Sequence, residues 1–443
     1  MAEAELLLSA RWLLPIAPEN RVIDDGAIAI ANGRITAIGQ RQELLAQFPN
    51  AKHQHLAEHV LMPGLVNAHG HAAMTLLRGC GEDMPLMDWL NNRIWPLERS
   101  LVSPEFVQDG SLLACAEQIR GGITAFADNY FYPERIAKLI QQTGMRALLA
   151  CPVLDFPMPG CADPKEAIAK TLKLHDDCRA LPLVNVAFGP HAPYTVSDEW
   201  LTQISTYAEE LGLLVHMHMH ESAAEIEGSM QQYGMRPLQR LENLGALGPH
   251  FVAVHSVHIN DDDLLILKRN NVQVVHCPES NLKLASGFAP VAKFLEHGIP
   301  VALGTDGAAS NNDLDLFGEL RSAAFIGKAL AGSPTAMPAE TMLQMATLGG
   351  AKALALEQEI GSLEIGKSAD VIAVDLSNLN LRPIYNPIYT LVYGAHRDDV
   401  SDVWVAGQAL LRNRDHLTID TKALKTRIQQ WQNRIMETLN EQR

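Results

Sequence analysis

The sequence lacks the short motifs that mark the common cofactor-binding and cysteine-dependent sites. None of its six cysteines forms a C-x-x-C pair, which disfavours a cysteine-ligated zinc site and leaves no pattern of a disulfide framework. No G-x-G-x-x-G, Walker or G-x-S-x-G sequence occurs, so neither a nucleotide cofactor nor that type of serine hydrolase is indicated. The H-x-E and P-C-x-x-C motifs of cytidine-deaminase-type zinc enzymes are missing as well.

Positive charge and long apolar segments are also scarce. The chain carries 51 acidic against 35 basic side chains, a formal net charge of -16, which makes nucleic acid and anionic membranes poor partners. No apolar run is long enough for a transmembrane helix, and residues 1–20 lack the basic segment of a signal peptide. The cysteines suit a reducing compartment, so we expect a cytoplasmic protein.

Short apolar runs are abundant between residues 61 and 310, and helical stretches separate them. The eight runs are LMPGLVNAHGH (61–71), GITAFADNYF (122–131), MRALLACPVL (145–154), LVNVAFGPHAP (183–193), LLVHMHMHES (213–222), FVAVHSVHI (251–259), VQVVHCPESN (272–281) and IPVALGTDGAAS (299–310). Apolar strands that alternate with helices indicate a parallel sheet buried on both faces. Eight of them predict an α/β fold with a closed (β/α)8 TIM barrel.

The N-terminal segment has a strand pattern of its own. AIAIANGRITAIG (27–39) contains two alternating apolar runs around Asn32-Gly33, a pair typical of a tight hairpin turn. The segments 361–376 and 400–413 resemble hairpin strands too. Both ends of the chain are therefore expected to share one small β-sandwich.

The predicted domain organisation follows from these patterns. Residues 1–60 and 361–420 are expected to form the β-sandwich, and residues 61–360 the barrel inserted between its two parts. Residues 421–443 have apolar side chains at helical spacing and predict a C-terminal helix. Its apolar face is expected to pack on the barrel or on a second subunit.

Two histidines follow the first run, in the sequence His69-Gly70-His71. In a strand, residues i and i+2 point to the same side, so both imidazoles can face one ion. The intervening glycine permits close approach. Two solvated histidines at a strand end are the simpler alternative, but the polar residues downstream favour metal binding.

Further titratable side chains lie at the ends of the later runs: His191, His218, Glu221, His255, His276 and Asp306. Barrel enzymes place their active sites at the C-terminal ends of the strands. In HMHMHE (216–221) three histidines share one face, and at most one or two can be ligands. Asp306 can complete a set of histidine ligands and leave a position open for water, although an N-cap of the next helix is the alternative.

These blocks together resemble the amidohydrolase superfamily, and within it the aminohydrolases that deaminate 5′-methylthioadenosine and S-adenosylhomocysteine, to which triazine hydrolases are related. The matching blocks extend over nearly the whole chain: PGLVNAHGHAAMTLLRG (63–79), GPHAPYTVS (189–197), HMHES (218–222), VAVHSVHI (252–259), HCPESNLKLASG (276–287) and GTDGAASNNDLDLF (304–317).

The resemblance implies one divalent metal ion, in the first place Zn²⁺, held by His69, His71, His218 and Asp306. It selects His218 over His216 because the family spaces ligand and acid as H-x-x-E. No lysine follows the fourth run to bridge a second ion, and a set of three histidines and one aspartate also accepts iron or manganese. His216 and His220 are more simply explained by packing, and the role of His276 stays open.

The resemblance also implies roles toward the substrate. Glu221 would shuttle a proton and contact the purine, His255 would orient the attacking water, and Asp306 would accept a proton from it. His191 would contact the purine, Ser310 would lie in the pocket, and Glu98 of IWPLERS would hold the ribose hydroxyls. The implied partner is a small-molecule purine nucleoside, and a homodimer or higher homo-oligomer is compatible with the family.

The loop VLDFPMPGCADP (153–164) bears on the choice of substrate. It has no arginine to bind the carboxylate of S-adenosylhomocysteine, and its apolar side chains suit a methylthio group. We therefore expect 5′-methylthioadenosine to be converted to 5′-methylthioinosine and ammonia. Adenosine is a further candidate substrate, and so is S-adenosylhomocysteine if another loop supplies an arginine.

Two alternatives remain. The same scaffold serves guanine deaminases and chloro-triazine hydrolases, but a free-base enzyme has little use for a carboxylate such as Glu98. An inactive barrel that serves as a binding or scaffold subunit should have lost ligands, whereas every expected position is filled here.

Overall fold

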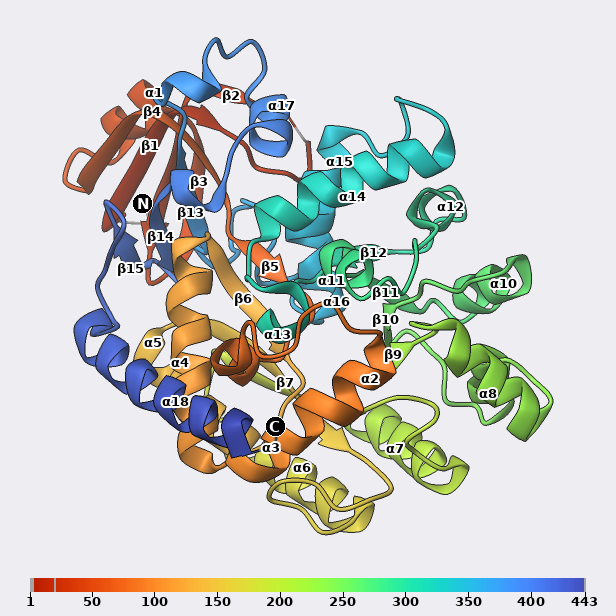
Figure 1. Ribbon diagram of the computed structural model, residues 1–443. Coiled ribbons are helices and arrows are strands. Elements are labelled where there is room, and N and C mark those ends of the chain that lie inside the picture. Colours follow the sequence, from red (N-terminus) through yellow and green to blue (C-terminus); the bar gives the residue numbers. More distant parts are fainter. Residues whose placement is uncertain (1–3, 20, 442–443) are drawn as a thin grey trace.

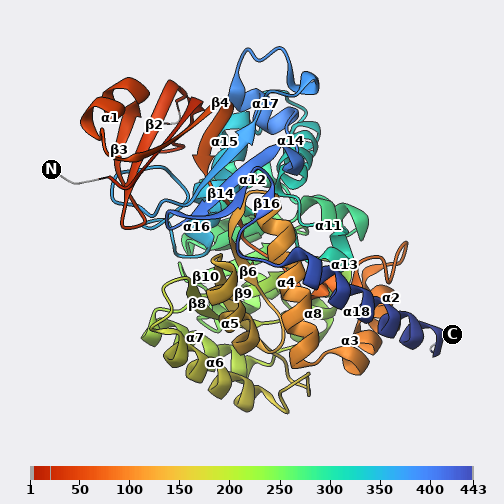
Figure 2. The same ribbon diagram turned by 90° about the vertical axis from the view of Figure 1, so that its left-hand side faces the viewer.

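The computed structural model describes residues 4–19 and 21–441. Residues 1–3, 20 and 442–443, which belong to the predicted sandwich and the predicted C-terminal helix, lie outside this part. A barrel surrounded by helices occupies one side of the molecule, and the strands of the two ends of the chain lie together at the other side (Figures 1 and 2). Within the described residues, no helix has the length and apolar character needed to cross a membrane.

The barrel strands lie where the apolar runs of the sequence predict them. In the described part of the chain they form one eight-stranded parallel sheet in chain order: β5 (Leu65–Asn67), β6 (Ile123–Asp128), β7 (Arg146–Val153), β8 (Val184–Pro190), β9 (Val215–Met219), β10 (Phe251–His255), β11 (Gln273–His276) and β12 (Val301–Leu303). The Ala68 N–H donates to the Leu303 carbonyl at 2.9 Å and links the first strand to the last. The predicted (β/α)8 fold is confirmed.

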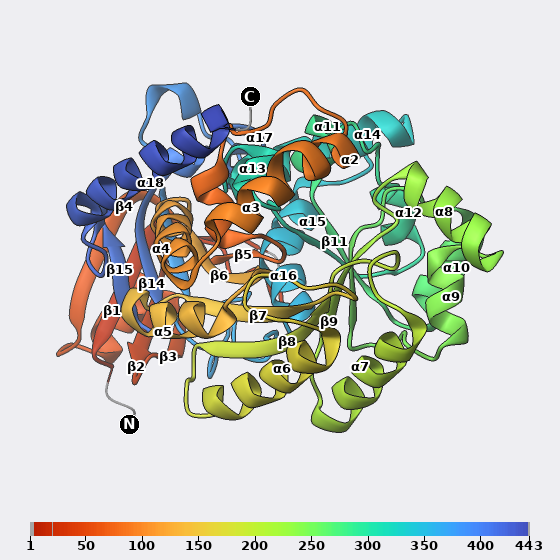
Figure 3. The ribbon, with the colours of Figure 1, turned by 60° about the horizontal axis from the view of Figure 1, so that its bottom comes forward.

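Helices connect these strands and surround them (Figure 3). They are η1 (Ala72–Leu77), α4 (Pro104–Arg120), α5 (Pro133–Thr143), α6 (Pro164–Cys178), α7 (Asp198–Leu211), α8 (Ala223–Tyr233), α9 (Pro237–Asn243), α10 (Asp261–Arg269), α11 (Pro278–Lys283), α12 (Val291–Glu296), α13 (Ala308–Asn311), α14 (Leu316–Ala331), α15 (Ala339–Gln344), η3 (Met345–Gly349) and α16 (Gly350–Ala353). Strand residues face the barrel interior or these helices, so both faces are buried, which explains the continuous apolar runs.

An additional helical segment follows the first strand and lies beside the barrel. It consists of α2 (Leu86–Trp89), η2 (Leu90–Ile94) and α3 (Trp95–Leu101), which continue one another along the chain. The middle piece is a π-helix, a wider turn that often occurs at functional sites. Nothing in the sequence pattern predicts this wider turn.

The strands of the two termini form a second sheet. Within the described residues its order is β16-β15-β14-β13-β4-β1-β2-β3. The bounds are β1 (Leu6–Leu13), β2 (Ile23–Ala31), β3 (Arg34–Gln40), β4 (Lys52–Pro63), β13 (Val371–Asp375), β14 (Val400–Val405), β15 (Gln408–Arg412) and β16 (Asp415–His416), accompanied by α1 (Arg41–Gln47), η4 (Leu379–Leu381), α17 (Pro387–Tyr393) and η5 (Arg397–Asp399). The strands expected to build a sandwich thus share a single hydrogen-bonded sheet.

The hairpin predicted at Asn32-Gly33 is confirmed. The two residues connect the antiparallel strands β2 and β3, and both have positive φ, 50° and 72°. By contrast, the strand expected over 361–376 is formed only from Val371 onward. Residues 361–370 form turns instead, with Gly361 and Gly366 at positive φ, and they pack beside the hairpin through the Arg34–Ser368 bridge.

The C-terminal helix α18 (Thr421–Glu441) packs on the barrel, one of the two placements that its spacing allowed. Leu424, Trp431 and Ile435 are buried, and the Trp431 ring meets Phe106 of α4 edge to face at 5.3 Å. The Trp431 indole N–H donates to Asp109 of the same helix at 2.9 Å. The helix therefore covers α4.

A buried ion pair joins the barrel to the terminal sheet. Arg146, at the start of β7, donates through Nε to Asp370 Oδ2 at 2.6 Å and through Nη2 to Oδ1 at 3.1 Å, and the two residues are 7% and 2% exposed. Removing one partner of a buried pair leaves an uncompensated charge in the interior.

We therefore expect Asp370→Ala to lower the free energy of unfolding by about 3–5 kcal/mol, measured by urea denaturation. Arg34→Ala, which breaks the exposed pair with Glu359, is the matched control and should cost no more than about 1 kcal/mol. Equal losses in the two variants would contradict a special role for the buried pair.

Candidate active site

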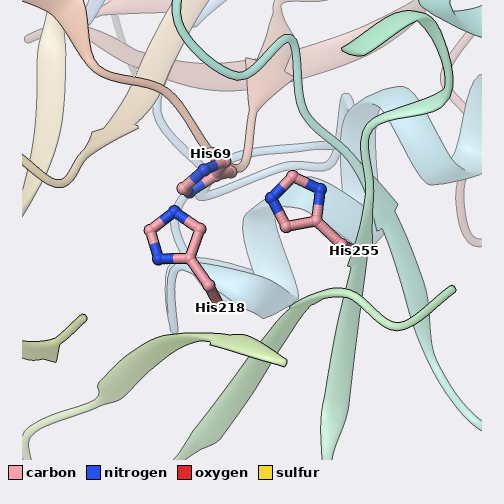
Figure 4. Close-up of side chains that lie close together, drawn as sticks. All are labelled: His69, His218 and His255. Carbon is pink, nitrogen blue, oxygen red and sulfur yellow. The ribbon is translucent and has the colours of Figure 1, made fainter. Parts of the chain in front are cut away.

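The C-terminal ends of the barrel strands bring the predicted site residues together. Figure 4 shows His69, His218 and His255 pointing toward a common centre from three separate segments. One candidate ligand atom from each of these three residues lies within 4.8 Å of the others, and the same holds for His69, His71 and Asp306. Barrel closure explains this meeting, because it places β12 next to β5.

Four side chains converge most closely. Asp306 Oδ1 lies 3.2 Å from His71 Nε2 and 3.4 Å from His69 Nε2, while His218 Nε2 lies 3.4 Å from His71 Nε2. These are the four residues that the resemblance implies as ligands.

Backbone carbonyls fix which ring nitrogen faces the centre. His71 Nδ1 lies 2.6 Å from the Asn129 carbonyl oxygen, and His218 Nδ1 lies 2.7 Å from that of His191. A carbonyl oxygen only accepts, so each Nδ1 carries the proton and donates. The Nε2 lone pairs of both rings are therefore directed at the centre, an arrangement typical of metal-ligating histidines.

His69 shows that the residues fit a metal ion. Its side chain is fully buried, and in the part of the chain that the structure describes neither ring nitrogen has a hydrogen-bond partner. A buried polar atom without a partner is costly. Because His69 Nε2 faces the converging nitrogens and Asp306, a cation at the centre would satisfy it, and three imidazoles with one carboxylate are donors that zinc accepts.

Asp306 is held as a carboxylate. Burial by itself raises the pKa of Asp306, but the contacts with His69 and His71 outweigh burial and hold it well below the usual range. The Gly307 N–H donates to Oδ1 at 2.8 Å. The hydroxyl of Ser310 lies 3.1 Å from Oδ2.

Glu221 and His255 lie beside this cluster. Glu221 Oε2 is 3.8 Å from His255 Nε2, and only 9% of Glu221 is exposed. Burial raises the pKa of the Glu221 carboxyl, with His255 acting in the opposite direction. A carboxyl with a raised pKa can carry a proton closer to neutral pH, as a general acid requires.

A cavity of about 550 Å³ opens over these residues. Its polar lining contains every predicted site residue except His69, namely His71, Glu98, His191, His218, Glu221, His255, Asp306 and Ser310. Its other side is apolar and comes largely from the helical segment 86–102 and the loop 152–159. The cavity is large enough for a small ligand that combines a polar and an apolar end.

Burial in this cavity favours the uncharged form of both Glu98 and His191. The Tyr130 hydroxyl donates to Glu98 Oε1 at 2.7 Å, and burial raises the pKa of Glu98 to about 7 although that bond lowers it. Burial lowers the pKa of His191 to about 4, so its imidazole is neutral at pH 7. The His191 Nδ1 lies 3.1 Å from the Thr195 hydroxyl.

The histidines whose roles were open, His216, His220 and His276, are buried and are not among the residues that line the cavity. His216 donates from Nε2 to the Ala68 carbonyl at 3.1 Å and stacks on His69 at 5.1 Å. His220 Nε2 accepts from the Leu238 N–H at 3.1 Å. His276 is also buried, and burial lowers its pKa to about 3.

Sequence reasoning missed several residues of the cavity. Asn129 and Tyr130, which follow β6, line the cavity. Asp128, the last residue of β6, accepts from the Ala72 N–H next to the histidine pair. Their position at a strand end is the same signal that identified the other residues. Arg99, an exposed residue of α3, also lines the cavity. The loop 153–164 has no arginine, as noted, but the segment after the first strand supplies one.

Known proteins resemble this chain over nearly its whole length. Residues 60–410 match the model of the Amidohydrolase family, and residues 26–51 match a bacterial imidazolonepropionase-like composite domain. The chain is 47% identical over 428 residues to a 5-methylthioadenosine/S-adenosylhomocysteine deaminase of Teredinibacter turnerae, which covers 97% of each chain. A relative of the same name from Saccharophagus degradans is 48% identical, covering 98% of this chain and 97% of its own.

Solved structures give the same picture. A crystal structure of an adenosine deaminase from Xanthomonas campestris with bound zinc has a TM-score of 0.96 and 44% identity, covering 98% of this chain and 99% of its own. An atrazine chlorohydrolase from Arthrobacter aurescens shares the fold at a TM-score of 0.90 and 23% identity, covering 96% of this chain and 99% of its own. The chain belongs to the amidohydrolase family. It is a hydrolase that acts on carbon–nitrogen bonds, as the sequence motifs predicted.

Metal content tests whether His69, His71, His218 and Asp306 hold an ion. We expect the purified protein to carry about one divalent ion per chain, and His69→Ala to lose most of it, because the most buried donor of the set is removed. Metal content is measured by inductively coupled plasma mass spectrometry. His297→Ala, at the surface end of α12, is the control and should retain the ion. Full retention by His69→Ala would contradict this ligand set.

Proposed function

We propose that this amidohydrolase deaminates adenine nucleosides, with 5′-methylthioadenosine as its preferred substrate. The observation that carries the proposal is the placement of Glu98 and an apolar wall in the same cavity as Glu221 and the histidine cluster. 5′-Methylthioadenosine needs such a combination, because its base reacts, its ribose offers hydroxyls and its 5′ substituent is apolar. The names of the relatives support the same substrate class.

The reacting end of the cavity suits attack of water on the purine. A divalent ion held by His69, His71, His218 and Asp306, most simply zinc, would supply Lewis-acid activation of a water at neutral pH. Glu221 donates a proton to purine N1, which makes C6 electrophilic. His255 orients the water through Nε2, and Asp306 accepts a proton from it. The water oxygen adds at C6. Asp306 passes its proton to the amino group, which leaves as ammonia, and the C6 hydroxyl returns a proton to Glu221, so the adenine becomes hypoxanthine.

The remaining contacts hold the rest of the nucleoside. The carboxylate of Glu98 accepts from the ribose hydroxyls, and the neutral imidazole of His191 contacts the purine. Ser310 completes the polar side of the pocket. This division argues against guanine or a triazine as the substrate, because neither has a ribose that would use Glu98.

The 5′ end is expected to meet the apolar loop. Leu154, Phe156, Pro157, Met158 and Pro159 line the cavity and offer no charge to an amino-acid tail. Arg99 of α3 is the cationic group in the cavity lining that could serve a carboxylate. Because Arg99 is exposed, its contribution to S-adenosylhomocysteine binding should be modest.

The cellular setting is part of the same proposal. All six cysteines are free thiols, which supports a reducing compartment such as the cytoplasm. The substrate is a small molecule, and the strongly acidic chain offers nothing to nucleic acid or anionic membranes.

A substrate panel tests the proposal. We expect 5′-methylthioadenosine to give the highest kcat/KM in an ammonia-release assay, with S-adenosylhomocysteine at least about tenfold lower, equivalent to about 1.4 kcal/mol. Adenosine should be deaminated, and guanine should not. Arg99→Ala should lower only the S-adenosylhomocysteine value. Rapid guanine turnover with silent nucleosides would contradict the proposal.

A second test concerns the proton donor. Glu221→Gln should reduce kcat by about 10²–10⁴-fold, because the amide cannot deliver a proton, while the metal content stays at the wild-type level. Glu227→Gln changes an exposed carboxylate on α8, the helix that follows Glu221, and serves as the control. Near-wild-type turnover by the Glu221 variant would remove this residue from the mechanism.

A further inference from the structure

The block HCPESN is among the most specific parts of the sequence, yet none of its residues has a role in the mechanism above. It spans the end of β11 and the start of α11, the short helix Pro278–Lys283. Two adjacent residues of this helix, Ser280 and Asn281, are almost completely buried, with 0% and 1% exposure. Buried polar side chains are costly unless they bind a partner, so their partners indicate what they do.

Asn281 contacts His255. Its Oδ1 lies 2.9 Å from His255 Nδ1, inside the protein. When the amide oxygen accepts from the ring N–H, the proton is fixed on Nδ1 and the His255 Nε2 lone pair points to the site. On that side Nε2 lies 3.8 Å from Glu221 Oε2. Asn281 therefore sets both the orientation and the tautomer of the imidazole.

Ser280 contacts Asp306. Its hydroxyl lies 2.7 Å from Asp306 Oδ2, closer than the Ser310 hydroxyl at 3.1 Å. With Oδ2 occupied by hydroxyl donors, Oδ1 is the oxygen that faces His69 and His71 at 3.4 and 3.2 Å. Ser280 thereby fixes the rotation of the carboxylate.

The helix that carries these two residues is itself anchored. The Glu279 N–H donates to Glu319 Oε2 at 3.1 Å, and Glu319 is a fully buried residue of α14. At the other end, the Ser286 N–H donates to the Asn281 carbonyl at 2.9 Å. A rigid support is what positioning of neighbouring groups requires.

We propose that Ser280 and Asn281 of α11 are positioning residues that orient Asp306 and His255, so that one short helix aligns the carboxylate and the imidazole on the two sides of the attacking water. The inference rests on the proposed function through the assay substrate, but half of its test needs no substrate.

Asn281 is tested by kinetics with 5′-methylthioadenosine. Asn281→Ala and the near-isosteric Asn281→Leu should lower kcat about 10–100-fold and leave KM within about twofold, since the partner of a site histidine is lost while the pocket remains. Asn281→Asp should recover most of kcat, because a carboxylate oxygen accepts from the same Nδ1–H. Leu282→Ala, exposed on the same helix, is the control.

Ser280 is tested by metal affinity alone. Ser280→Ala should weaken zinc binding about tenfold in a chelator competition, and Ser280→Ala combined with Ser310→Ala should weaken it further. Leu282→Ala should bind zinc as the wild type does. Unaltered zinc affinity in both serine variants would overturn the role of Ser280 whatever the substrate is.

The Asn281 role has its own contrary outcomes. Wild-type kcat in Asn281→Leu, or no recovery in Asn281→Asp, would overturn it, provided that thermal unfolding shows a wild-type fold. If no nucleoside is turned over by the wild type, the proposed function fails, and the zinc measurements still decide the role of Ser280.

Discussion

Closure of the barrel is the constraint on which the site depends. The hydrogen bond from Ala68 to Leu303 joins the first and last barrel strands, and the Asp306 N–H donates to the His69 carbonyl at 3.1 Å just beyond it. Residues that are far apart in the sequence thus become neighbours at the mouth of the barrel. Without that closure Asp306 would not lie beside the histidine pair. The position of Asp306 beside His69 and His71 is therefore a consequence of the fold's last pairing.

The converging side chains also depend on the backbone around them. In both His71 and His218, Nδ1 donates a hydrogen bond to a backbone carbonyl oxygen, so that Nε2 faces the centre. Asp306 is kept charged by its histidine neighbours, whereas burial pushes the pKa of Glu221 upward. Two carboxyl groups in one cavity are thus biased toward opposite protonation states, a pattern that separates a proton acceptor from a proton donor.

The sequence predicts those features of the fold and the site that depend on residues close together in the chain, and it predicts contacts between distant residues less well. The barrel strands and the hairpin at Asn32-Gly33 could be predicted because apolar runs and turn residues are local signals. The site residues could be predicted as one group, because the C-terminal ends of barrel strands meet at one face. The backbone carbonyl groups that bind the histidines could not be predicted, because every residue type has a carbonyl group and the sequence does not distinguish one from another.

Two further features of the structure have no recognisable pattern in the sequence. The π-helix at Leu90–Ile94 shifts the register of the helical segment that carries Glu98 and Arg99, and no residue pattern announces such a turn. The continuity of the terminal sheet depends on the parallel pairing of β1 with β4. Strand patterns define faces, but they do not define which strands pair.

The apolar loop 153–164 and Arg99 contribute unequally to binding of the 5′ substituent. Each buried methyl or methylene group contributes about 0.8 kcal/mol, so an apolar wall rewards a methylthio group directly. An exposed arginine paired with a carboxylate contributes about 0–1 kcal/mol. Phe156 and Met158 offer an amino-acid tail no hydrogen-bond partner in exchange for the water that it would lose. One exposed guanidinium does not offset that loss, so the wall of loop 153–164, and not Arg99, should decide which nucleoside is preferred.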